Sequence, residues 1–274
     1  MRPHVAAVYA FARVADDFAD EGVVAPAERR ARLRDWQARL HRAAEAPPTA
    51  NHVAPTHASD RHELLFTAIG HSIRSLGLPV ALFDDLLSAF GQDTTTTRYD
   101  SWADVLDYCR RSANPVGRLV LRIAGRVSDD LDRSSDAMCT ALQLTNFWQD
   151  FGRDWRDGRL YIPREVADGC GADERDLASG RLTDAWAAAL GRCIEKTRAL
   201  FTDGRAVCDG VSGRLRYELR LTWLGGCRML DRVASRRCDL LGHRPTLGAP
   251  DVPSLVWHAL RWGPLPSGSS THLS

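Results

Sequence analysis

Two short acidic stretches hold the residues whose types and spacing are suited to chemistry. Asp16 and Asp20 are four residues apart, as are Asn146 and Asp150, and Asp150 and Asp154. On an α-helix such residues share a face, where stacked carboxylates repel by roughly 0.2–0.5 kcal/mol per pair and favour a compensating cation. Mg²⁺ suits this pattern because it prefers oxygen ligands and is usually held by a few carboxylates plus substrate phosphates. The two stretches together predict a magnesium diphosphate site.

Two alternatives to a metal site apply to these stretches. An acidic face on a helix is often simply solvated. The second stretch also contains Phe147, Trp148 and Phe151, which leave its polar side little access to water, so a buried Arg–Asp network is the second alternative. That network would use Arg13, Arg153, Arg156 and Arg159. The histidines His52, His57 and His62 lie in or beside a predicted loop, and their spacing matches no metal site.

The chemistry that such a site would serve is departure of diphosphate from an allylic or cyclopropyl carbon. Mg²⁺ would neutralise the charge that develops on the leaving group, and arginine forks would bind its oxygens. Arg13 lies three residues before Asp16, and Arg159 and Tyr161 closely follow the second stretch. The resulting carbocation needs a dry pocket with aromatic walls. The candidates for those walls are the aromatic residues of the two stretches and their neighbours: Tyr9, Phe11, Tyr108, Phe147, Trp148 and Phe151. Ordinary core packing also explains each of these residues singly.

The helical period recurs along the whole chain, which predicts an all-α fold. Helices are expected near residues 3–21, 27–46, 61–76, 79–91, 101–112, 115–127, 132–156, 183–209, 213–241 and 252–262. Proline and glycine mark the breaks between them, and Thr94–Thr97 is expected to be a connector and not a strand. We expect one domain over residues 1–263 and a disordered tail over residues 264–274, which is rich in Ser, Gly and Pro.

Composition narrows the setting of the protein. A net charge of +1, from 36 basic and 35 acidic residues, gives no electrostatic reason to expect nucleic acid as a partner. Seven scattered cysteines without a C-x-x-C pair favour a reducing cytoplasm over a disulfide framework or a zinc site. The N-terminus does not resemble a signal peptide, and no apolar run approaches the roughly 20 residues that span a bilayer. Residues 253–262 form a short amphipathic segment that contains Trp257 and Trp262. This segment is expected either to pack on the helical bundle or to contact the inner face of the membrane peripherally.

Taken together, these residues resemble the squalene/phytoene synthase family over nearly the whole chain, and within it the bacterial hydroxysqualene synthases of hopanoid synthesis. The runs that carry the resemblance are residues 2–13, 16–21, 108–121, 143–163 and 219–226. The resemblance implies a type I isoprenoid (terpenoid) synthase bundle with a central apolar cavity. It also implies ionisation of presqualene diphosphate and capture of the cation by water, without a nicotinamide.

The resemblance also assigns roles to particular residues. The Mg²⁺ ligands would be Asp16, Asp20, Asn146, Asp150 and Asp154. The diphosphate would be bound by Arg13, Arg159 and Tyr161. The residues expected at the reaction centre are Tyr9, Tyr108, Asn146, Gln149 and Tyr161. The implied partners are presqualene or farnesyl diphosphate and the other enzymes of hopanoid synthesis.

Two departures from the family pattern qualify these expectations. Members that couple two prenyl diphosphates commonly carry Arg where this chain has Gln149, which is consistent with a site for one diphosphate. Members also usually have a segment ahead of residues 2–4 that helps to cover the diphosphate, and this sequence begins after it. The alternatives are head-to-head coupling, as in squalene, presqualene diphosphate or phytoene synthases, and a non-catalytic relative.

Overall fold

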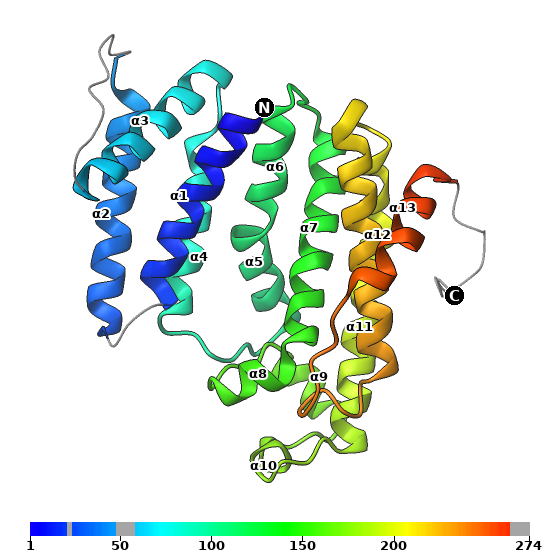
Figure 1. The fold of residues 1–274 in the computed structure, drawn as a ribbon. Coiled ribbons are helices and arrows are strands. Elements are labelled where there is room, and N and C mark those ends of the chain that lie inside the picture. The colour runs from blue at the N-terminus through cyan, green and yellow to red at the C-terminus, as the bar shows by residue number, and fades with distance from the viewer. Residues whose placement is uncertain (21–23, 48–57, 264–274) are drawn as a thin grey trace. The chain divides into compact units, whose positions relative to one another are not determined.

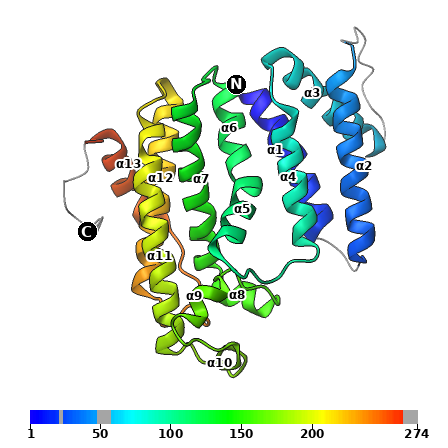
Figure 2. The same ribbon diagram turned by 180° about the vertical axis from the view of Figure 1, so that it is seen from behind.

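Helices account for all the regular structure in the part of the chain that can be described. The computed structural model describes residues 1–20, 24–47 and 58–263, and these residues contain no strand. The all-α prediction is therefore confirmed. Backbone contacts divide the chain into two units: unit 1 consists of residues 1–96 and 111–128, and unit 2 of residues 97–110 and 129–274 (Figures 1 and 2). The expectation of one domain stays a prediction, and so does the central cavity.

Unit 1 is built around the aromatic side chain of Phe11. It contains α1 (Arg2–Asp20), α2 (Pro26–Glu45), α3 (Ala58–Leu76), α4 (Val80–Asp93) and α6 (Asn114–Ile123). Phe11 is fully buried and contacts the rings of Trp36, Phe66 and Phe83, with ring centroids 5.7, 6.3 and 5.5 Å away. These contacts tie α1 to α2, α3 and α4. The opposite face of α1, which holds Tyr9, Arg13 and Asp16, is left outside this core.

Unit 2 is a set of long helices packed side by side, with short helices at one end. It contains most of α5 (Trp102–Ser112), together with α7 (Asp129–Gln149), α8 (Phe151–Arg156), α9 (Arg164–Asp168), α10 (Glu174–Ala178), α11 (Asp184–Gly204), η1 (Arg205–Cys208), α12 (Gly213–Ser235), η2 (Ala249–Asp251) and α13 (Val252–Leu260). α7 packs against α11 and α12. α7 and α11 approach so closely that a Cβ on Gly204 would lie 2.5 Å from the backbone nitrogen of Met138. Trp148 donates a hydrogen bond to the Thr197 hydroxyl over 2.9 Å, which satisfies both buried polar groups.

The helix boundaries depart from the prediction in three places. The helix expected over 132–156 is interrupted at Asp150, which separates α7 from α8. The helix expected over 213–241 ends at Ser235, and the backbone of Leu240 and Leu241 lies against Gly152 of α8. α9 and α10 were not predicted, since helices of five residues are too short to show a helical period. Thr94–Thr97 is a connector, as expected.

The end of the described chain packs inward through one tryptophan. The Trp262 ring lies 5.4 Å from that of Trp223 and 4.1 Å from the guanidinium of Arg205, and its indole N–H donates to Asp209 over 3.3 Å. Packing on the bundle is therefore what the structure shows for Trp262, whereas Trp257 is exposed. None of the described helices is both long enough and apolar enough to cross a bilayer.

All seven cysteines lie in the described residues, and none of them forms a disulfide. Cys109, Cys193, Cys208 and Cys227 are buried, and burial raises the pKa of each of these thiols well above its usual value. Cys238, just after α12, is the exposed one. The expectation that these residues hold no zinc stays a prediction.

Candidate active site

The first acidic stretch forms a charged cluster at the end of α1. Arg13 contacts both Asp16, over 3.4 Å, and Asp17, over 2.8 Å. Asp16 keeps 40% of its side chain exposed, and Tyr9 is 70% exposed. Asp20 is the last residue of the helix, four positions after Asp16. Unit 1 therefore brings the predicted Arg13, Asp16 and Tyr9 to one exposed side of α1, away from Phe11.

The second acidic stretch stays aligned although its helix is interrupted. The backbone N–H of Asp150 donates to the carbonyl of Asn146, and that of Asp154 donates to the carbonyl of Asp150, each over 2.8 Å. Helical hydrogen bonding thus continues on both sides of Asp150, and the three residues follow one another four positions apart on one side. Asn146 is exposed, while Asp150 and Asp154 are half-buried. The three predicted residues of unit 2 therefore lie along one side of this stretch.

Arg244 is the main partner of this stretch, and no sequence pattern predicts it. Its Nε and Nη2 contact the two carboxylate oxygens of Asp150, with Nη2 and Oδ2 3.3 Å apart. This contact raises the pKa of Arg244. Arg244 lies 94 residues after Asp150, in the segment of residues 240–247, which we call the strap. An Arg–Pro pair in a loop shows no periodicity that could have identified it.

The ionised form of Asp154 is in a less favourable electrostatic position than that of Asp150. Burial raises the pKa of Asp154 to about 6, the charge of Arg159 opposes this rise, and the charge of Asp150 adds to it. The backbone N–H of Arg159 also donates to the Asp154 carbonyl over 2.7 Å, which holds the two residues together. The predicted arginine therefore lies beside the acidic stretch.

An aromatic cluster adjoins these acids within unit 2. Tyr161 stacks on Phe147 with ring centroids 3.7 Å apart and ring planes 3° apart. The Tyr108 ring lies 6.0 Å from Phe147, and the Tyr99 ring lies 5.7 Å from Tyr161. Tyr99 was not among the predicted residues, because it precedes α5 in a connector without periodicity. The structure thus groups two predicted residues, Tyr108 and Tyr161, around Phe147.

Gln149 has a structural contact that the sequence did not suggest. It is 7% exposed, and its side-chain amide donates to the Pro245 carbonyl over 2.8 Å. Pro245 follows Arg244, so Gln149 holds the strap next to the residue that contacts Asp150. The assignment of Gln149 to the reaction centre stays a prediction, while its contacts support a role in positioning.

The oxygen donors of unit 2 fit Mg²⁺ chemically. Asn146, Asp150 and Asp154 offer one amide oxygen and two carboxylates, which are the hard ligands that this ion prefers. Burial is the main cause of the raised pKa of Asp154, and a divalent cation bound beside its carboxylate would favour the ionised form. Within the described residues, no three His, Cys, Asp or Glu side chains are grouped as a metal site. Binding by these three residues would leave the other positions to water and phosphate, and binding shared with Asp16 and Asp20 of unit 1 stays a prediction.

The structure shows only part of the Arg–Asp network that was considered as an alternative to a metal site. The arginine that pairs with Asp150 is Arg244, which is not one of the four considered for that network. Arg153 lies 3.9 Å from Asp157, and Arg156 donates to the Leu241 carbonyl of the strap over 3.1 Å. Arg13 and Arg159 do lie beside acids of the two stretches. His52 and His57 of the histidine-rich loop lie outside the described residues.

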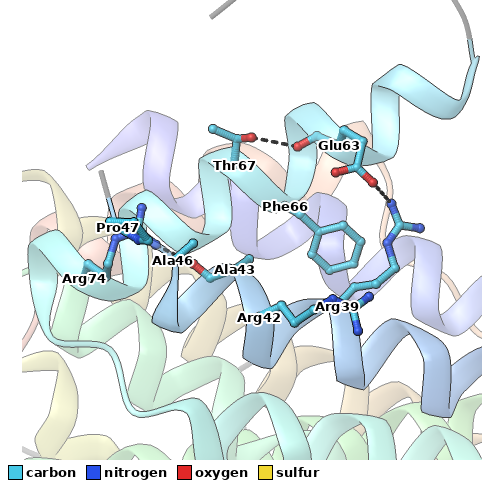
Figure 3. Close-up of a pocket in the computed structure, with 9 residues that line it drawn as sticks. All are labelled: Arg39, Arg42, Ala43, Ala46, Pro47, Glu63, Phe66, Thr67 and Arg74. Carbon is cyan, nitrogen blue, oxygen red and sulfur yellow. Dashed lines mark hydrogen bonds and ion pairs between the residues drawn. The ribbon is translucent and has the colours of Figure 1, made fainter. Parts of the chain in front are cut away.

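A separate pocket of about 280 Å³ lies between α2 and α3 of unit 1 (Figure 3). Arg39 reaches across the ring of Phe66 to Glu63, with 2.5 Å between nitrogen and oxygen. Arg74 donates to the backbone carbonyl of Ala43. None of the predicted site residues lines this pocket, so it is distinct from the acidic stretches.

Comparison with known proteins gives one consistent result. Residues 1–251 match the family model of squalene/phytoene synthases. The hydroxysqualene synthase of Rhodopseudomonas palustris is 35% identical over 237 residues, or 86% of this chain and 75% of that protein. The hydroxysqualene synthase of Zymomonas mobilis is 39% identical over 177 residues, which are 64% of this chain and 54% of that protein. This chain thus spans about half the length of the Zymomonas relative.

Solved structures agree with the sequence matches. The crystal structure of squalene synthase HpnC from Alicyclobacillus acidocaldarius is 37% identical, has a TM-score of 0.76, and covers 86% of this chain and 84% of its own. A dehydrosqualene synthase solved in complex with a ligand is 20% identical with a TM-score of 0.79, covers 94% of this chain and 86% of its own, and supports the fold alone. The helical fold is therefore that of isoprenoid synthases. With the acidic stretches, the aromatic cluster and the match over residues 1–251 in agreement, the chain belongs to the squalene/phytoene synthase family.

Proposed function

We propose that this chain is a Mg²⁺-dependent enzyme that converts presqualene diphosphate and water into hydroxysqualene and diphosphate. The observation that carries the proposal is the alignment of Asn146, Asp150 and Asp154 next to Arg159 and the Tyr161–Phe147 stack. It is supported by the hydroxysqualene synthases that are 34–39% identical to the chain.

The reaction balances without a redox partner. The bond between carbon and the diphosphate oxygen breaks, and its electron pair leaves with the diphosphate. The cyclopropylcarbinyl cation rearranges, and a water oxygen then bonds to the cationic carbon and loses a proton. The products are the C30 alcohol, diphosphate and one proton, so no reductant is consumed.

The residues divide between the two ends of the substrate. When bound, Mg²⁺ would neutralise negative charge on the departing diphosphate. Arg159 would bind the diphosphate oxygens. The roles that the resemblance implies for Arg13, Asp16 and Asp20 of unit 1 stay predictions. The faces of Tyr108, Phe147 and Tyr161 would stabilise the cation and exclude water until capture.

The test of this function is product analysis. Radiolabelled presqualene diphosphate would be incubated with the purified chain and Mg²⁺, without reductant, and we expect a C30 alcohol and diphosphate. Asp150→Ala is the matched inactive control. A parallel incubation would supply farnesyl or geranylgeranyl diphosphate as the substrate. If it yielded presqualene diphosphate or a C30 or C40 hydrocarbon, the chain would catalyse head-to-head coupling instead. Absence of any Mg²⁺-dependent diphosphate release would identify a non-catalytic relative.

We further propose a cytoplasmic enzyme that contacts the inner face of the membrane through α13 and works alongside other enzymes of hopanoid synthesis. Val252, Val256, Trp257 and Leu260 are between 40% and 62% exposed. Residues 252–263 contain no acid, and the Arg261 guanidinium lies 4.1 Å from the Trp257 ring. Exposed Trp and Leu beside Arg suit an anionic bilayer surface, from which a C30 substrate would be drawn.

Vesicle co-sedimentation tests the membrane contact. We expect the chain to sediment with vesicles that contain anionic phospholipid, and the double variant Trp257→Ala with Leu260→Ala to remain in solution. Tyr217→Ala removes another exposed aromatic side chain of unit 2 and is the control. Equal sedimentation of the double variant and the unaltered chain would refute a role for α13.

A further inference from the structure

The contact between Arg244 and Asp150 has a direct bearing on metal binding. Arg244 offers two N–H groups to the two carboxylate oxygens, which is the forked geometry that makes arginine a strong partner of carboxylates. A divalent cation would use the same oxygens. It would also be repelled by a guanidinium held against them, because like charges at such distances repel strongly in a half-buried site. The arginine and the metal therefore compete for Asp150.

The surroundings of Arg244 allow it to leave without unfolding the strap. The strap backbone is fixed by other residues: Gln149 bonds the Pro245 carbonyl, Arg156 bonds the Leu241 carbonyl, and Arg232 bonds the Thr246 carbonyl. None of these contacts uses the Arg244 side chain. That side chain is 47% exposed, whereas Asp150 is 22% exposed, so rotation toward solvent is open to the arginine while the carboxylate stays in place.

We propose that Arg244 is an internal counter-cation that occupies Asp150 in the metal-free protein and is exchanged for the divalent ion when the site is loaded. The inference rests on the proposed function, because it takes Asp150 as a metal ligand. Arg244 acts through Asp150 and is therefore a positioning residue, and Gln149 places it by fixing Pro245. The exchange lowers the affinity of the empty enzyme for the metal alone.

The experiment measures binding of Mn²⁺ alone to the full chain by isothermal titration calorimetry, without substrate. Arg244→Gln removes the competing charge, so we expect it to bind Mn²⁺ about tenfold or more tightly than the unaltered chain. Arg244→Lys keeps the charge but loses the fork, so its affinity should lie between the two. Arg237→Gln removes the same charge from an exposed arginine that does not contact Asp150, and we expect it to leave the affinity unchanged.

The outcomes separate this inference from the proposed function. If Asp150→Asn loses Mn²⁺ binding while Arg244→Gln binds no more tightly than the unaltered chain, Asp150 is a metal ligand and the exchange is refuted. Should Arg244→Gln fail to fold, as judged by circular dichroism, an Arg244→Lys variant with unchanged or weaker affinity refutes it equally. If neither the unaltered chain nor Arg244→Gln binds Mn²⁺, the exchange and the metal dependence of the proposed function both fail. Tighter binding by a folded Arg244→Gln is a result that a merely structural arginine would not give.

Discussion

Replacement of Gly152 by alanine tests how the strap is seated on α8. A Cβ at this position would lie 2.5 Å from the backbone carbonyl oxygens of both Leu240 and Leu241 and 2.8 Å from the Leu241 Cα. These are backbone atoms, which cannot rotate away as the end of a side chain can. Either the strap moves off α8 or the helix shifts, and both disturb the hydrogen bond from Gln149 to Pro245.

The expected size of the effect follows from opposing contributions. Overpacking of a close contact typically costs about 1–3 kcal/mol, and loss of the Gln149 hydrogen bond adds about 1 kcal/mol. Alanine is better than glycine inside a helix by about 0.8–1 kcal/mol, which offsets part of this. The net expectation for Gly152→Ala is a decrease of about 1–3 kcal/mol in the free energy of unfolding.

The matched control is Gly191→Ala, in the middle of α11. A Cβ there would have no heavy atom within 4 Å, so only the gain in helix propensity applies, and the variant should be up to about 1 kcal/mol more stable than the unaltered chain. Urea denaturation followed by circular dichroism compares the three proteins under identical conditions. The two substitutions should change stability in opposite directions. If Gly152→Ala were as stable as Gly191→Ala, the close seating of the strap would be wrong.

Three further predictions concern other parts of unit 2. The folded pKa of Asp154 is about 6 against an ordinary 3.8, so the metal-free folded state binds more protons than the unfolded state between these values. The contribution of Asp154 to stability therefore falls as pH rises through that window. Asp154→Asn should raise the urea midpoint of unfolding at pH 7.5 and change it little at pH 4.5. An equal change at both pH values would contradict the raised pKa of Asp154. Tyr161→Ala removes the stack on Phe147 and should lower the free energy of unfolding, measured in urea, by about 2–4 kcal/mol. Tyr161→Phe keeps the ring, so its free energy of unfolding should stay within about 1 kcal/mol of that of the unaltered chain. Similar losses in both variants would show that the stack is unimportant. Trp262→Ala should speed amide exchange in α13 through loss of the contacts with Trp223, Arg205 and Asp209, and unchanged exchange would show that α13 is held by other means.

The local features of the candidate site could be predicted because they depend on residues close in sequence. Spacing of four residues placed Asn146, Asp150 and Asp154 on one side, and backbone hydrogen bonds retain that alignment through the interruption at Asp150. Arg159 lies five residues after Asp154, and a short turn returns it to the acid. Periodicity therefore carried enough information for these positions.

The features that could not be predicted depend on residues distant in sequence. The pairing of Arg244 with Asp150 and the bond from Gln149 to Pro245 need a strap about 95 residues away, and only the missing Cβ of Gly152 makes room for it. Tyr99 joins the aromatic cluster from a connector that has no repeating pattern. The sequence left undecided whether Trp262 packs inward, because its partners lie on η1 and α12, far from it along the chain.

The exposure of Cys238 makes this chain suitable for labelling with a fluorophore. Four of the seven thiols are buried and carry raised pKa values, so little of the reactive thiolate forms at neutral pH. Cys238 is exposed and lies two residues before the strap begins. A maleimide dye would therefore attach fastest beside the segment that carries Arg244, and its emission would report movement there without any engineered cysteine.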